Sequence, residues 1–137
     1  MGRLICVLGG VVVILGAGVL AEEKAPESYS KAMKASGASV QSLGKSVETK
    51  DYDALGKEAM SLKMTFTDLE KFWTDRKIED AMTFARAGLK ASTDLVNAAR
   101  SKDDAAIGDA RKALTGSCGG CHAAHREKLA DGTFSIK

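Results

Sequence analysis

The chain has 137 residues, of which 45% are hydrophobic, 28% charged and 5% aromatic, and its formal net charge is +2. The 20 basic and 18 acidic residues are spread along the chain, which excludes a strongly basic nucleic-acid-binding domain. A single Pro beside 14 Gly excludes a Pro-rich linker or a low-complexity tail. This composition is typical of one globular domain that favours helix.

Residues 1–21 differ in character from the rest of the chain. Arg3 precedes an uncharged apolar run from Leu4 to Ala21, and acidic residues follow it. The pattern predicts a secretory signal peptide that is cleaved after Ala21. The alternative is an uncleaved membrane anchor, because the run is just long enough to span a bilayer as a helix. In either case, residues 22–137 form the functional domain.

Residues 22–137 show helical periodicity and no strand signal. Apolar or small residues recur every three or four positions in four segments, which predicts four amphipathic helices. The expected inward faces are Tyr29, Met33, Ser36, Val40, Leu43 and Val47; Leu55, Ala59, Leu62, Phe66, Leu69 and Trp73; Ile78, Met82, Ala85, Leu89, Ser92, Val96 and Ala99; and Ile107, Ala110, Leu114, Cys118 and Cys121.

Polar residues between these segments predict short connections. Thr74 or Asp75 is expected to cap the third helix, and Ser101 with Asp104 resembles a capping box for the fourth. Gly132 is the expected terminator of the fourth helix. Four helices joined by short turns predict an all-α, antiparallel up-down-up-down bundle.

The sequence Cys118-Gly-Gly-Cys121-His122 near the C-terminus carries the chemistry. On a helix these positions are i, i+3 and i+4, so both thiols and the imidazole share one face. Cys-x-x-Cys-His is the attachment sequence of a c-type haem, in which the thiols bond to the haem vinyl groups and the imidazole binds the iron. Gly119 and Gly120 are expected to let the porphyrin edge approach the backbone. Because bacterial haem attachment takes place outside the cytoplasm, the predicted signal peptide agrees with a periplasmic location.

Other interpretations of the motif remain open. A disulfide between Cys118 and Cys121 would close a very short loop and constrain little of the unfolded chain. A zinc site would need Cys118, Cys121, His122 and His125, which crowd into two helical turns. A thioredoxin-like pair would need a βαβ context. A haem-free interaction bundle is the remaining alternative.

The mature sequence resembles the class II c-type cytochromes, the family of cytochrome c′ and cytochrome c556. Two stretches carry the resemblance: Cys118–Arg126, with a basic residue four positions after the haem His, and Lys31–Gly37. The chain departs from the family at His125, where an aromatic residue is usual, and in the short connection between helices 2 and 3. The resemblance implies one covalent haem and a possible homodimer through the first two helices.

The resemblance also implies that Met33 is the second iron ligand. Together with His122 it would fill both axial positions, which favours one-electron transfer with redox partner proteins and no enzymatic activity. If Met33 only packs nearby, the iron is five-coordinate and suits binding of nitric oxide or carbon monoxide. Met60, Met64 and Met82 are assigned to packing.

Basic residues around the motif have weaker interpretations. Arg126 is expected one turn after His122, beside the imidazole or a haem propionate, unless it is a solvated surface residue. The last helix is expected to be locally basic and to steer an acidic redox partner, through Arg111, Lys112, His125 and Lys128.

Overall fold

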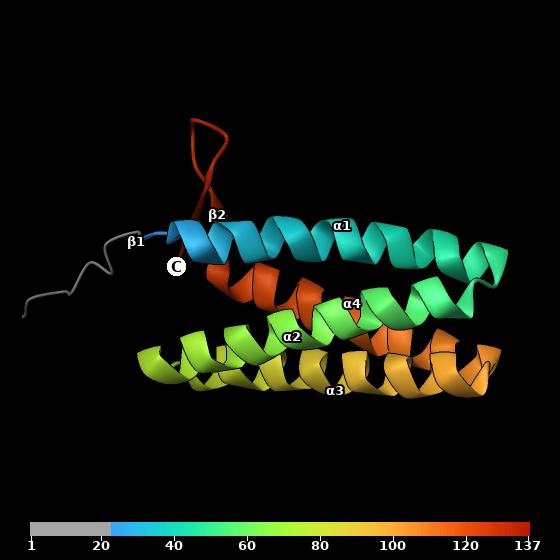
Figure 1. Ribbon diagram of the computed structural model, residues 1–137. Coiled ribbons are helices and arrows are strands. Elements are labelled where there is room, and N and C mark those ends of the chain that lie inside the picture. Colours follow the sequence, from blue (N-terminus) through green and yellow to red (C-terminus); the bar gives the residue numbers. More distant parts are fainter. Residues whose placement is uncertain (1–22) are drawn as a thin grey trace, which may run out of the picture.

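The computed structural model describes residues 23–137, so the predicted signal segment and its cleavage site lie outside the described residues. Its elements are β1 (Glu23–Lys24), α1 (Glu27–Thr49), α2 (Tyr52–Arg76), α3 (Glu79–Ser101), α4 (Asp104–His125), β2 (Arg126–Lys128) and β3 (Phe134–Ile136). The four helices pack sequentially along their lengths, as expected of an up-and-down bundle (Figure 1). The prediction of a four-helix all-α domain is confirmed. None of the helices in residues 23–137 is long and apolar enough to cross a membrane.

A lysine in the left-handed conformation ends each of the first three helices. Lys50, Lys77 and Lys102 have φ values of 54°, 57° and 54°. Their backbone N–H groups return to carbonyls of the helix just completed, which satisfies acceptors that a helix end leaves unpaired. The next helix starts two residues later in each case, so consecutive helices are forced to run antiparallel.

Two predicted helix starts are wrong. Thr74 and Asp75 lie inside α2, and Ile78 is the N-cap of α3. Asp103 rather than Ser101 caps α4, because its side chain accepts a hydrogen bond from Ala106 N at 3.0 Å. The same arrangement begins α2, where Asp51 accepts from Ala54 N at 3.0 Å. In both turns, the acid directly before the helix captures an unpaired N–H group.

The fourth helix also ends earlier than predicted. It stops at His125, and Arg126 adopts an extended conformation with φ −121° and ψ 132°. Gly132 belongs instead to the turn between β2 and β3, where its φ is 83°. The three strands form an antiparallel sheet in the order β1-β3-β2, which joins the first described residues to the last. Ile136 of β3 is buried and extends the core beneath the sheet.

The most extensive helix packing is between α2 and α3. All six inward positions predicted for α2 are buried, from Leu55 to Trp73. Phe66 packs directly over Gly88 of α3, where any added Cβ would overlap its ring. A ring seated on a glycine backbone brings two helix axes close together, so this contact sets the spacing of the central pair.

The first helix is the loosest member of the bundle. Its main partner is α2, and its direct contact with α4 is marginal at most. Among its predicted inward residues only Leu43 is fully buried, whereas Val40 is 37% exposed. The face of α1 that points towards α4 is therefore incompletely covered by protein atoms.

Candidate functional site

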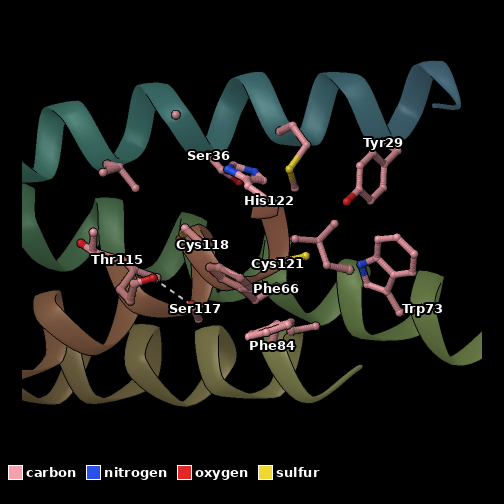
Figure 2. Close-up of a pocket in the computed structure, with 16 residues that line it drawn as sticks. Tyr29, Ser36, Phe66, Trp73, Phe84, Thr115, Ser117, Cys118, Cys121 and His122 are labelled. Atoms are coloured by element: carbon pink, nitrogen blue, oxygen red, sulfur yellow. Dashed lines mark hydrogen bonds between the residues drawn. The ribbon is translucent and has the colours of Figure 1, made fainter. Parts of the chain in front are cut away.

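A cavity of about 240 Å³ occupies the region where α1 is least covered. Side chains from all four helices line it, and they are overwhelmingly apolar. Figure 2 shows α1 on one side of this space and the C-terminal half of α4 facing it. The lining residues are Tyr29, Met33, Ser36, Gly37, Val40, Phe66, Leu69, Trp73, Phe84, Ala85, Leu114, Thr115, Ser117, Cys118, Cys121 and His122.

The three chemical groups of the motif all reach this cavity. Cys118, Cys121 and His122 lie in the last two turns of α4, which runs without a break to His125. The helical spacing places the two thiols and the imidazole on one face, as the sequence predicts. Both cysteines are half-buried free thiols. The structure therefore brings together a set of donors that can act on one occupant.

Burial keeps both thiols protonated at neutral pH. It raises the pKa of Cys118, and it raises the pKa of Cys121 to about 11, with the charges of Cys118 and Asp80 adding to the effect on Cys121. Since the thiolate is the form that forms disulfides and binds metals, both thiols are slow to react in those ways.

The imidazole of His122 is held in its neutral form. Its pKa is lowered, first because the ring is half-buried and second because the positive charge of Arg126 lies nearby. A neutral imidazole has a nitrogen lone pair available for a metal. His122 is therefore ready to bind a metal centre without first losing a proton.

Met33 is the methionine that shares the cavity with the motif. It lines the cavity from α1, whereas the motif residues line it from α4. Met60 and Met64 are 37% and 61% exposed, and Met82 packs against the core outside the cavity. Within residues 23–137, Met33 thus has a position that the other three methionines do not have.

His125 does not line the cavity that the motif residues line. Its ring packs against Trp73 with 5.2 Å between centroids, and its nitrogens lie 3.0 Å from Asp80 Oδ2 and 3.3 Å from the Lys137 carbonyl oxygen. The imidazole joins the end of α4 to the start of α3 and to the C-terminal residue. The four-residue zinc alternative therefore lacks one donor, and the described part of the chain contains no group of three or more potential metal-binding side chains.

Arg126 lies beside the site but not on the helix that carries it. As the first residue of β2 it places its guanidinium 4.4 Å from the centre of the Phe134 ring. Its N–H group donates to the His122 carbonyl, and its charge acts on the imidazole. The prediction that Arg126 lies on the helix one turn after His122 is wrong. The prediction that Arg126 lies close to His122 is confirmed.

The two glycines of the motif have different surroundings. A Cβ at Gly120 would overlap the ring of Phe84 on α3, whereas a Cβ at Gly119 would meet nothing within 4 Å. Gly120 therefore allows α3 and α4 to approach each other closely. The sequence predicts one role for both glycines, because Phe84, which distinguishes them, belongs to a different helix.

Several cavity residues were expected only as core. Tyr29 and Trp73 form an aromatic cluster at one end, with 5.8 Å between their ring centroids in an edge-on arrangement. Their places on the predicted inward faces were a signal of burial, but not of a shared cavity.

Comparison of the chain with protein-family models, curated proteins and solved structures found no match.

The contrast between the motif glycines gives a first prediction. We expect Gly120→Ala to destabilise the protein by about 1–3 kcal/mol, because the new methyl group must displace the Phe84 ring. Gly119→Ala is the matched control and should be neutral or stabilising by up to ~1 kcal/mol. Urea unfolding of both variants tests this, and equal effects would contradict the packing assigned to Gly120.

The raised pKa of Cys121 gives a second prediction. In the folded protein without a bound cofactor, alkylation of this thiol by iodoacetamide should rise steeply only as the pH approaches about 11, rather than near the ordinary value of 9.0. In denaturant the ordinary profile should return. Mass spectrometry of the alkylated peptide measures both rates, and identical pH profiles would show that burial does not control the thiol.

Proposed function

We propose that this protein is a periplasmic c-type cytochrome of the class II kind that carries one covalently attached haem and transfers single electrons between redox partner proteins. Cys118 and Cys121 would hold the haem, His122 would bind its iron, and Met33 would be the second axial ligand. The signal segment would be removed on export. In this role the protein is a carrier and not an enzyme.

The observation that carries the proposal is that donors from two separate helices line one apolar cavity. The motif alone is five residues of α4, but Met33 lies 85 positions earlier in the chain and lines the same space. An apolar cavity with a few convergent donors is the expected form of a cofactor site. No Asp, Glu, Lys or Arg side chain is among the lining residues, which also suits a largely apolar macrocycle.

The size of the cavity bears on how a haem would fit. At about 240 Å³ it is smaller than the roughly 300–1,000 Å³ of typical small-molecule sites. A planar macrocycle would need α1 to move away from α4. The direct contact between these two helices is marginal at most, so few packed atoms of α1 and α4 would have to separate.

The residues of the chain have separate tasks in this proposal. Cys118 and Cys121 would hold the haem through thioether bonds, since addition of a thiol across a carbon–carbon double bond, with sulfur on one carbon and the proton on the other, would need no oxidant. The neutral imidazole of His122 supplies its nitrogen lone pair, and Met33 supplies a thioether. When bound, the haem supplies a reversible one-electron change at iron. Arg126 places a positive charge near His122, where it would tune that change.

Covalent attachment is the third prediction. Protein matured together with the haem-attachment machinery should keep its colour in acidified acetone, because thioether bonds survive conditions that extract a non-covalent haem. The double variant Cys118→Ala/Cys121→Ala should lose its haem to the solvent under the same treatment. Loss of colour from the wild-type protein would show that the motif does not form thioethers.

The fourth prediction concerns Met33. Met33→Ala should change a low-spin, six-coordinate spectrum into a high-spin, five-coordinate one and lower the reduction potential, because the thioether ligand is lost while His122 and both thioether links remain. Optical and paramagnetic-resonance spectra measure the spin state, and potentiometry measures the potential.

Met64→Ala is the matched control, because Met64 is 61% exposed and lies outside the cavity. It should change neither spectrum nor potential. A wild-type protein that is already high-spin, and that Met33→Ala leaves unchanged, would replace the electron carrier by the five-coordinate protein that binds nitric oxide or carbon monoxide.

A further inference from the structure

The hairpin formed by β2 and β3 projects from the bundle at the end that carries the Cys-x-x-Cys-His sequence. Figure 1 shows it standing out beside the first turns of α1, and the pairing of β1 with β3 fixes its base there. Its first residue, Arg126, donates its backbone N–H to the His122 carbonyl oxygen. None of its residues lines the cavity. The hairpin is therefore attached to the candidate site without being part of it.

One face of this hairpin combines two cations with an exposed aromatic ring. Lys128 pairs directly with Phe134, and Arg126 lies two residues before Lys128 on β2, so the three side chains share a face. The Arg126 guanidinium lies 4.4 Å from the centre of the Phe134 ring, a cation–π contact that holds both groups in place. Phe134 is 42% exposed and is the only exposed aromatic residue within residues 23–137. We call these three residues the basic aromatic face.

The acidic residues of the small sheet do not neutralise this face. Glu127 pairs with Ser135 and so points to the opposite side of β2. The Asp131 carboxylate accepts hydrogen bonds from the N–H and hydroxyl groups of Thr133, at 2.9 and 2.6 Å, inside the hairpin turn. Glu23 belongs to β1, at the far edge of the sheet, with β3 between it and β2. The positive charge on the face therefore lacks a carboxylate on the same strand or in the turn.

The charges and the strand edge together indicate how a partner would bind. Neither Arg126 nor Lys128 forms an ion pair within residues 23–137. All three residues of the edge strand β2 are charged and exposed, which disfavours pairing with a further strand. A partner would therefore bind through side chains, with carboxylates for the cations and an apolar group for the ring. A face of this size is too small for a stable dimer, but transient redox encounters use small interfaces.

We propose that the basic aromatic face is the docking surface for an acidic redox protein, whose carboxylates pair with Arg126 and Lys128 and whose apolar side chains cover Phe134. The proposal rests on the electron-carrier function proposed above and names the class of its partner. A protein docked here lies against the end of α4 that carries His122, and electron transfer is faster over shorter distances. One electron leaves the reduced cofactor of the partner and is accepted at the haem iron, or passes in the reverse direction.

The test follows electron transfer from a reduced acidic flavodoxin to the oxidised, haem-loaded protein by stopped-flow spectroscopy. Lys128→Glu should lower the second-order rate constant about 3- to 10-fold at low ionic strength, and high salt should remove the difference, because salt screens exposed charges. Phe134→Ser should lower it about 2- to 5-fold at both salt concentrations, because an apolar contact is not screened. Neither residue lines the cavity, so the reduction potential should stay the same in both variants.

Lys57→Glu is the matched control, because Lys57 is an exposed lysine near the start of α2, at the opposite end of the bundle (Figure 1). It makes the same change of charge and should leave the rate nearly unchanged. Carbodiimide, which joins lysine amines to carboxylates, should cross-link the flavodoxin to Lys128 and not to Lys57.

Two results would overturn the docking surface while the carrier function stands. One is a haem-loaded Lys128→Glu protein that accepts electrons as fast as the wild-type protein at low salt. The other is cross-linking of Lys128 to a second copy of this chain in place of the flavodoxin, which would make the face a contact between copies. A protein that holds no covalent haem would refute the carrier function and the docking surface together.

Discussion

The seating of the Phe66 ring on Gly88 is the contact on which the arrangement of the helices depends. It sets the distance between α2 and α3, and Phe84 on Gly120 repeats the device between α3 and α4. The first helix has no equivalent, since Gly37 has open space where its side chain would be. Close packing is thereby concentrated in α2, α3 and α4, and space remains beside α1. The cavity is a consequence of which glycines face an aromatic ring.

Much of the fold was predictable because amphipathic periodicity is local. The six inward positions of α2 are all buried, and the face of α4 that carries Cys118 follows from helical spacing alone. The strands were missed because β1 pairs with a segment more than a hundred residues away, so neither sequence looks like a strand by itself. The turns were predicted, but the residues that end the helices were not, because Lys50 and its counterparts adopt a conformation that glycine usually takes.

The candidate site was predictable only where its residues belong to a single helix or to the apolar face of an amphipathic helix. Periodicity on α1 was enough to direct Met33 inward, but the existence of a shared cavity depends on how α1 and α4 are spaced. The fate of His125 could not be foreseen, because Asp80 and the Lys137 carbonyl that hold it come from distant parts of the chain. The contact of Arg126 with the Phe134 ring likewise becomes visible only when both strands of the hairpin are in place.

The small sheet has a consequence for the order in which the molecule is completed. Glu23 pairs with Ile136, a contact between nearly opposite ends of the described chain. Closing so long a loop costs more entropy than forming any helix turn, and it cannot occur until the last residues have been synthesised. The helices can form and pair beforehand, because each is joined to the next by two residues. The sheet therefore forms last. Until it has formed, the end of the bundle that carries the Cys-x-x-Cys-His sequence is the easiest part to open.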